Sequence, residues 1–496
     1  MVNQKTELSR YEVPSRPRPE LGKVLVTGAT GYVGGRLVPA LLARGYTVRV
    51  MVRAASSEHH ERWPRAEIAV ADTADFTSLV SALDGIHTAY YLIHSLLLGP
   101  KQFEAAEILN ARNFRRAAEL KQVKRIIYLG GLGDMQTALS AHLRSRVQVA
   151  EELKGGAVAA TILRAAIIIG SGSASYEIIK NLVQNLPVIF IPRWAKTRCQ
   201  PIAVRDVIKY LIGVLESDAT VGRAFDIGGK DILTYESMIR TLVSLLGRKK
   251  LFVPVPFSNL TVYSYLASLL TPVPAPITMC LMAGLKNDVV CLDNAIRRVV
   301  PFEPLSYRES LVLAMTREEQ DDVRTRWSDA YPPAWELAIK LRELKQPPEY
   351  TAERAILTDK SAARLFRSIT HIGGREGWFH SNWLWRARGI MDRILLGVGS
   401  ARGRKMYSSL SINDVVDFWR VEDIQAERLL LLRAEMKLPG RAWLEFRIDP
   451  VNGRNRLTVK AYYQTRGLLG KTYWYMFLPF HYFIFDDLVK QIEKRS

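Results

Sequence analysis

The stretch KVLVTGATGYVG, residues 23–34, decides how the first part of this chain folds. Residues 24–26 form a short apolar run with no polar face, which is typical of a strand buried on both sides. Gly28, Gly31 and Gly34 then recur at every third residue, and an amphipathic helical pattern begins. A strand, a tight glycine turn and a helix in this order predict a dinucleotide-binding βα unit, whose turn and helix N-terminus receive a pyrophosphate.

The composition limits the class of protein. With 496 residues, 48% of them hydrophobic, the chain is long enough for two or three domains with sizeable cores. Its three cysteines (Cys199, Cys280 and Cys291) are too few and too scattered for a disulfide framework or a metal site, so no metal is expected. The residues before the first strand are polar and contain prolines, which predicts a loose tail rather than a secretory signal.

The net charge of +20 requires a partner or an explanation. The arginines are spread along the chain and no nucleic-acid motif is present, which argues against nucleic acid. An anionic membrane surface and a phosphorylated ligand both suit this charge, and a generally basic proteome would also account for it.

Further strands alternate with helices after the glycine turn, so we expect an α/β fold with a doubly wound parallel sheet and ligands at the carboxyl ends of its strands. The expected strands cover residues 47–52, 68–71, 88–93, 125–129 and 162–169. Arg53 lies at the carboxyl end of the strand 47–52. At this position an acidic residue would bind the ribose hydroxyls of NAD, whereas an arginine would bind the 2′-phosphate of NADP. NADP(H) is therefore the preferred cofactor and NAD(H) the alternative; a solvated surface arginine is the plainer interpretation.

With Thr27 in front, TGATGYVG resembles the extended and atypical members of the short-chain dehydrogenase/reductase family, near the NmrA-like proteins and the NAD(P)-binding accessory subunit of respiratory complex I. The resemblance implies that Asp72 faces the adenine, and the expected strand 88–93 delivers His94 and Ser95 to the cofactor edge of the sheet. The expected cofactor-binding residues are Gly28, Ala29, Thr30, Gly31, Tyr32, Val33, Gly34, Arg53, Asp72, Ile93, His94 and Ser95.

The resemblance fails at the family's catalytic residues. Family enzymes carry a Ser after the fifth strand and Tyr-x-x-x-Lys on the next helix, whereas this chain has Gly130 and Gly131, then His142-x-x-x-Arg146. His142 could act as a general acid or base, and Arg146 could hold a ribose or a phosphate without exchanging protons. An exposed polar helix face is the competing interpretation of this pair.

A second cluster of cations follows the expected sheet. Arg193, Lys196 and Arg198 surround Trp194, which suits a phosphorylated or otherwise anionic substrate; a charged loop is the alternative. The apolar residues 260–285 are interrupted by alternate prolines, so we expect two short helices rather than a membrane span.

We expect a tail at 1–20, the Rossmann domain at 21–325, a linker at 326–350 and a smaller α+β domain at 351–496. The last part pairs alternating strands with an aromatic helix, and it resembles the helix-grip (START-like) fold and a domain of unknown function fused behind some atypical family members. We expect it to fold alone around an apolar cavity, and we expect the apolar run 473–485 to pack in the core rather than at a membrane interface.

These observations favour an NAD(P)H-dependent oxidoreductase whose small-molecule substrate is apolar or anionic, with quinones and lipids among the candidates. One alternative is a non-catalytic NADP(H)-binding redox sensor or complex-assembly protein. Another is a lipid or quinone carrier acting through the C-terminal domain. A cytoplasmic location is expected, with peripheral contact to an anionic membrane or a protein complex as a further option.

Overall fold

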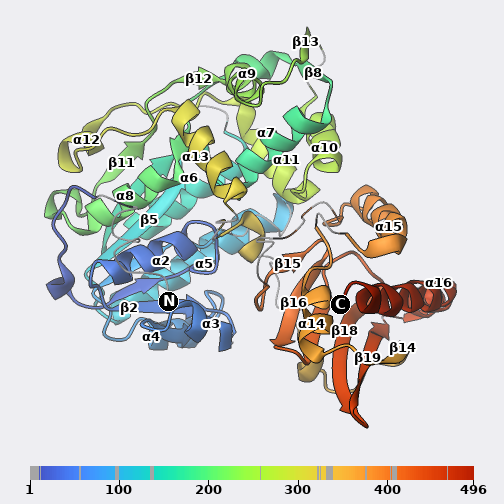
Figure 1. The fold of residues 1–496 in the computed structure, drawn as a ribbon. Coiled ribbons are helices and arrows are strands. Elements are labelled where there is room, and N and C mark those ends of the chain that lie inside the picture. The colour runs from blue at the N-terminus through green and yellow to red at the C-terminus, as the bar shows by residue number, and fades with distance from the viewer. Residues whose placement is uncertain are drawn as a thin grey trace. The chain divides into compact units, whose positions relative to one another are not determined.

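The chain forms two compact units (Figure 1). Unit 1 comprises Met1–Ala267 and Pro276–Tyr331, and unit 2 comprises Ser268–Ala275 and Pro332–Ser496. The computed structural model describes residues 11, 13–54, 57–94, 100–133, 139–256, 259–320, 323, 325–330, 339–374, 377–400, 402, 404, 410–465 and 467–496.

Unit 1 is built on a seven-stranded sheet whose neighbouring strands all run parallel. In chain order the strands are β1 (Val24–Val26), β2 (Val48–Val52), β3 (Glu67–Val70), β4 (Thr88–Tyr91), β5 (Arg125–Gly131), β6 (Ala159–Ala165) and β11 (Ala224–Ile227). The spatial order is β11-β6-β5-β4-β1-β2-β3. The strand order therefore reverses between β1 and β4, which places the ligand-binding crevice at their carboxyl ends. The expected doubly wound parallel sheet is confirmed.

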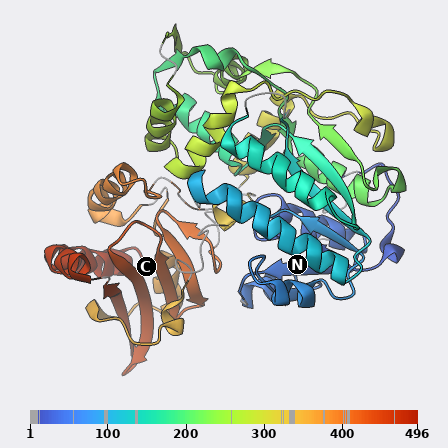
Figure 2. The ribbon, with the colours of Figure 1, turned by 180° about the vertical axis from the view of Figure 1, so that it is seen from behind.

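Helices cover both faces of this sheet. One face carries α2 (Gly34–Ala43) and α8 (Val204–Leu215), and the other carries α4 (Phe76–Ala82), α5 (Pro100–Leu120) and α6 (Ala141–Lys154), of which α5 and α6 lie in front in Figure 2. Val24 and Val26 pack in the first core and Leu25 packs in the second. This is why β1 has no polar side chain: both of its faces are buried.

The other elements up to residue 319 lie outside the seven-stranded sheet, and the two that border Ser268–Ala275 extend into unit 2. They include the two short helices expected between residues 260 and 285, and no helix among the described residues is long and apolar enough to cross a membrane. The elements are α3 (Ser57–Arg62), β7 (Ile168–Ile169), α7 (Ala174–Asn185), β8 (Val188–Ile191), β9 (Arg198–Cys199), β10 (Ile202–Ala203), β12 (Leu233–Thr234), α9 (Tyr235–Leu245), β13 (Leu251–Pro254), α10 (Leu260–Leu270), α11 (Ala275–Ala283), α12 (Ala295–Val299) and α13 (Tyr307–Glu319).

Unit 2 contains a six-stranded antiparallel sheet. Its order is β14-β19-β18-β17-β16-β15, so the first strand pairs with the last. Asn452 and Gly453, both with positive φ, form the turn between the two longest strands, as the Asn-Gly pair predicts. The strands are β14 (Tyr350–Thr358), β15 (Val415–Val416), β16 (Trp419–Gln425), β17 (Leu429–Ala434), β18 (Gly440–Val451) and β19 (Arg454–Thr465).

Within the described part of 339–496, the α-helices are α14 (Ala362–Thr370), α15 (Asn382–Ile394) and α16 (Gly467–Lys494). α16 packs on β14 and β19, which confirms an antiparallel sheet with a C-terminal helix, while the helix-grip likeness stays a prediction. The expected core packing of the aromatic run holds for only part of it. Trp474 and Phe485 are buried against the sheet, whereas Tyr475, Phe480 and Phe483 are exposed, because a helix offers the sheet one face only.

A short segment from the middle of the chain completes unit 2. The buried Arg393 guanidinium on α15 donates to the carbonyl oxygen of Val273 at 3.0 Å and to that of Thr271. Burial lowers the pKa of Arg393 to about 10. The carbonyls that satisfy this buried cation thus come from Ser268–Ala275, about 120 residues away in sequence.

Replacing Arg393 should therefore destabilise unit 2. We expect Arg393→Ala to lower the free energy of unfolding by about 2 kcal/mol, since two buried carbonyls lose their donor and a cavity is left. Arg386→Ala, at an exposed position of the same helix, should change it by less than about 0.5 kcal/mol. Calorimetric unfolding of the full chain measures both variants, and equal effects would contradict this role of Arg393.

Candidate active site

The carboxyl ends of β1 and β4 are joined by Thr27. Its backbone N–H donates to the carbonyl of Tyr90 at 3.0 Å, and its Oγ1 accepts from the N–H of Leu92 at 3.1 Å. The residue after β1 thereby fixes the residues that follow β4. Two segments far apart in sequence meet at the switch point of the sheet.

The glycine turn fits a pyrophosphate. Gly28 has φ +63°, and a Cβ there would lie 2.5 Å from the carbonyl oxygen of Leu92; a Cβ on Gly34 would lie 2.4 Å from that of Gly28. At Gly31 the only described heavy atom within 4 Å of an added Cβ is the Gly28 oxygen, at 3.1 Å. Gly28 and Gly34 let the turn close, and at Gly31 the described residues bring only one backbone oxygen near an added Cβ, so the turn suits the close approach of a phosphate.

The expected nucleotide contacts of the neighbouring strands lie at the same edge of the sheet. Arg53 follows β2 directly and is exposed. Asp72 follows β3, is also exposed, and accepts from the N–H of Ala74 through Oδ1 at 2.9 Å. Their contacts with the 2′-phosphate and the adenine remain predictions.

A chain of hydrogen bonds starts directly after β4. His94 Nδ1 lies 3.0 Å from Glu107 Oε1 on α5, and His94 Nε2 lies 3.1 Å from His142 Nε2 on α6. Ile93 precedes this pair, while Ser95 lies outside the described residues. His94 and His142, singled out separately from the sequence, are therefore in contact beside the glycine turn.

Glu107 holds this chain in place. Its carboxylate is buried and also accepts from Ser145 Oγ at 2.7 Å and from the Arg146 guanidinium. The Arg146 side chain is only 6% exposed and forms an ion pair with Glu107. In this structure the guanidinium thus binds a carboxylate of the protein, whereas we expected it to hold a ribose or a phosphate. Sequence reasoning missed Glu107, although it shares one buried face of α5 with Ala111, Phe114 and Ala118, at helical spacing.

The environment keeps both imidazoles neutral at pH 7. Burial lowers the pKa of His94 to about 4, with Arg146 adding to this effect and Glu107 opposing it. Burial is the main reason that the pKa of His142 lies well below its usual range. Positive charge on His94 or Arg146 would lower it further. Because the Glu107 carboxylate can only accept, the hydrogen-bond pattern assigns a proton to His94 Nδ1, and His142 Nε2–H then donates to His94 Nε2.

The sequence also holds a Tyr-x-x-x-Lys spacing that we did not single out, on α7. Tyr176 is fully buried and its hydroxyl donates to Glu318 at 3.3 Å, while Lys180 Nζ lies 3.0 Å from both Glu177 and Glu318. Burial raises the pKa of Tyr176 far above its usual range. The spacing thus belongs to a buried ionic network that ties α7 to α13.

The expected substrate cations lie together at the surface. Arg193 and Lys196 are exposed on the 3-10 helix η2 (Arg193–Lys196), and Arg198 pairs with Asp288 at 3.0 Å. Trp194 turns inward and packs edge-on against Tyr263, with ring centroids 5.6 Å apart. The tryptophan therefore anchors this turn, and the role of the cations in substrate binding remains a prediction.

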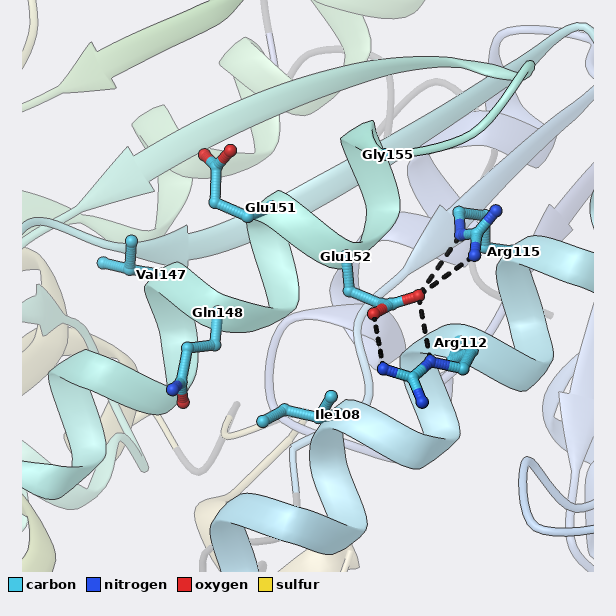
Figure 3. Close-up of a pocket in the computed structure, with 8 residues that line it drawn as sticks. All are labelled: Ile108, Arg112, Arg115, Val147, Gln148, Glu151, Glu152 and Gly155. Atoms are coloured by element: carbon cyan, nitrogen blue, oxygen red, sulfur yellow. Dashed lines mark hydrogen bonds and ion pairs between the residues drawn. The ribbon is translucent and has the colours of Figure 1, made fainter.

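An open depression of about 620 Å³ lies along α5 and α6 (Figure 3). Glu152 lies in it, bound by Arg112 and Arg115. The depression contains none of the histidines. Among the described residues no group of three or more His, Cys, Asp or Glu is arranged to hold a metal ion. The residues that line the depression are Ile108, Arg112, Arg115, Val147, Gln148, Glu151, Glu152 and Gly155.

Two family models match the chain. Residues 28–184 match an NAD(P)H-binding family, and residues 346–488 match a protein family of unknown function, DUF2867. Unit 1 is thus an NAD(P)H-binding Rossmann domain, and the expected cofactor class is confirmed. The C-terminal part carries a DUF2867 domain, which confirms the expected fusion to a domain of unknown function.

Curated relatives match stretches of different lengths. The 3 beta-hydroxysteroid dehydrogenase/Delta 5→4-isomerase of Mycobacterium tuberculosis is 34% identical over 118 residues, 22% of this chain and 31% of that protein. Subunit 9 of the NADH dehydrogenase [ubiquinone] 1 alpha subcomplex of Arabidopsis thaliana is 23% identical over 287 residues, 55% and 71% of the two chains. This chain spans about a third of the length of the relatives it matches first.

Among solved structures, the triphenylmethane reductase of Citrobacter sp. complexed with NADP(H) is similar to 59% of this chain. The match covers 99% of the reductase chain, at 18% sequence identity and a TM-score of 0.48. The two curated relatives, a dehydrogenase/isomerase and an NADH dehydrogenase subunit, agree with the expected resemblance to the short-chain dehydrogenase/reductase family.

The lowered pKa of His94 predicts how stability depends on pH. Between the ordinary value of 6.5 and about 4, the unfolded chain binds a proton at His94 that the folded chain does not bind. The free energy of unfolding should therefore fall as the pH falls through this window, by at most about 1.4 kcal/mol per pH unit for this histidine.

Denaturation at a series of pH values measures this slope. His94→Gln should make it shallower, whereas His60→Gln, at an exposed position, should leave it unchanged. The same slope in wild type and His94→Gln would contradict a shifted His94.

Proposed function

We propose that the protein is an NADP(H)-dependent oxidoreductase whose proton transfer runs through His142, His94 and Glu107. The observation that carries this proposal is the hydrogen-bonded chain of these three side chains at the switch point of the sheet. The glycine turn lies directly beside it, since a Cβ on Gly28 would meet the carbonyl oxygen of Leu92. A proton relay and a nucleotide cradle thus share one edge of the sheet.

The cofactor would supply or accept a hydride, and the protein's residues would manage its partner proton. Gly28–Gly34 would hold the pyrophosphate and Arg53 the 2′-phosphate. His142 Nδ1 takes a proton from a substrate hydroxyl as its Nε2–H passes to His94 Nε2. The Nδ1–H of His94 shifts toward Glu107 in the same event, and all of these movements reverse when the substrate is reduced. Because both imidazoles have low pKa values, the carboxylate is needed to share the positive charge.

Arg146 acts in this proposal as a positioning residue. Its guanidinium and the Ser145 hydroxyl fix the orientation of the Glu107 carboxylate, so that one oxygen faces His94. The substrate is a small molecule that is apolar or anionic, with a quinone or a lipid as candidates. Arg193, Lys196 and Arg198 would attract an anionic one.

One observation favours a different class of function. At the family's serine position, a Cβ on Gly130 would lie 2.8 Å from the Tyr128 ring, and a Cβ on Gly131 would lie 3.3 Å from Leu143. The site thus has no hydroxyl there to orient a substrate oxygen. A redox sensor or assembly protein that binds NADP(H) without turnover is therefore the second candidate, and the C-terminal domain as a lipid or quinone carrier is the third.

The proposal predicts a preference for one cofactor. NADPH should bind more tightly than NADH, because Arg53 can pair with the 2′-phosphate through charge-assisted hydrogen bonds worth roughly 1.5–3 kcal/mol. Arg53→Ala should weaken NADPH binding roughly 10- to 100-fold and leave NADH binding nearly unchanged. Arg65→Ala, an exposed arginine before β3, is the matched control. Fluorescence titration measures these affinities, and equal curves for the two cofactors in the wild type would refute the preference.

The second prediction concerns the chemistry. His142→Gln should lower turnover roughly 10²–10⁴-fold, the usual scale for losing a general acid or base, with little change in cofactor affinity. His60→Gln should leave both unchanged. The measurement is NADPH oxidation with a panel of carbonyl, quinone and enoyl substrates. Full activity of His142→Gln would remove this residue from the reaction, and NADPH binding without turnover on any substrate would favour the sensor.

A further inference from the structure

Two helices of unit 2 turn apolar side chains outward. On α15, Trp383 is 65% and Ile390 63% exposed, and on α16 Leu468 and Leu469 are 81% and 78% exposed. Exposure on this scale is what an interaction surface shows, because a monomer rarely leaves large side chains of this kind together in water. The outer face consists of Trp383, Ile390, Met391, Ile394 and Leu395 on or next to α15, and Leu468, Leu469, Tyr475, Met476, Phe480, Tyr482 and Phe483 on α16.

The helical spacing shows that this exposure is a feature of whole helix faces. On α15, residues 383, 390 and 394 share one side, while Trp385, Gly389 and Asp392 are buried on the other. α16 likewise buries Trp474 and Phe485, and between them it exposes Tyr475, Met476, Phe480, Tyr482 and Phe483. Both helices contact the 3-10 helix η8 (Phe379–Ser381), and they lie next to each other in Figures 1 and 2.

Positive charges predominate around the outer face. α16 holds no Asp or Glu from Gly467 to Phe485 and exposes Lys471, while Asp486, the next residue, is paired with Lys490 at 2.7 Å. The acid of α15, Asp392, is fully buried and accepts from backbone N–H groups, whereas Arg386 is exposed. Arg354 lies over the ring of Tyr482, 4.4 Å from its centroid.

The exposed apolar side chains and the nearby cations favour one kind of partner for the outer face. A second copy of the same face would bring like charges such as Arg386 and Lys471 together, which is unfavourable. A bilayer interface instead accepts Leu and Phe below the headgroups, Trp and Tyr at their level, and Arg and Lys beside lipid phosphates. We propose that the outer face of α15 and α16 docks unit 2 onto membranes rich in anionic phospholipid. This inference does not depend on hydride transfer.

Vesicle flotation of the full chain tests the proposal. It should bind vesicles of phosphatidylcholine with phosphatidylglycerol, less tightly as salt rises, and bind pure phosphatidylcholine far more weakly. The double variants Ile390→Gln/Ile394→Gln and Leu468→Gln/Leu469→Gln should each weaken binding at least about tenfold, since apolar area is lost from the interface. The control Leu251→Gln/Leu292→Gln removes exposed leucines of unit 1 and should leave binding unchanged.

Further measurements distinguish a membrane from a second copy of the chain as the partner of this face. Arg386→Glu/Lys471→Glu should weaken binding to the anionic vesicles and leave the weak binding to neutral ones as it was. All substituted side chains are exposed, so unchanged unfolding temperatures are expected and should be verified. No binding to either vesicle, or binding that the apolar variants do not reduce, would overturn the proposal. Self-association that the same variants abolish, without vesicle binding, would assign the face to a second copy and also overturn it.

Discussion

The site depends on one local constraint, the attachment of β1 to β4 by Thr27. Its N–H donates to Tyr90 within β4 and its hydroxyl accepts from Leu92 directly after the strand, so the start of the glycine turn is tied to the segment leading to His94. Gly28 belongs to the same constraint, because only a residue without Cβ can pass the Leu92 carbonyl. The glycine turn and a pair of imidazoles are thereby held at one edge of the sheet by short-range backbone contacts.

The parts of the fold governed by local chemistry could be predicted from the sequence. Residues 24–26 and the glycine turn are specified by their own side chains, and the Asn452-Gly453 turn by positive φ at both positions. The partner of His94 could not be found in this way. Glu107 meets His94 only because α5 packs beside β4, and its sole local signal is an acid on a buried helix face. The proximity of His94 and His142 likewise arises from packing between elements.

The C-terminal helix shows a different limit of sequence reasoning. Its aromatic run is apolar on nearly every side, so composition alone does not say which residues meet the sheet. The structure selects Trp474 and Phe485, and it leaves Tyr475 and Phe480 in contact with solvent. Hydrophobicity predicted burial for the whole run, whereas the structure fully buries only two of its thirteen residues.

The two units bury charge by different means. Glu107 is stabilised by an imidazole, a hydroxyl and a guanidinium, whereas Arg393 relies on backbone carbonyls of Thr271 and Val273. Those carbonyls lie within a segment flanked on both sides by residues of unit 1. In evolutionary terms, unit 2 is not a detachable module: appending residues 332–496 to another Rossmann domain would leave its arginine without acceptors. Any transplanted form of this unit that keeps the arginine buried therefore has to carry residues 268–275 as well as the C-terminal stretch.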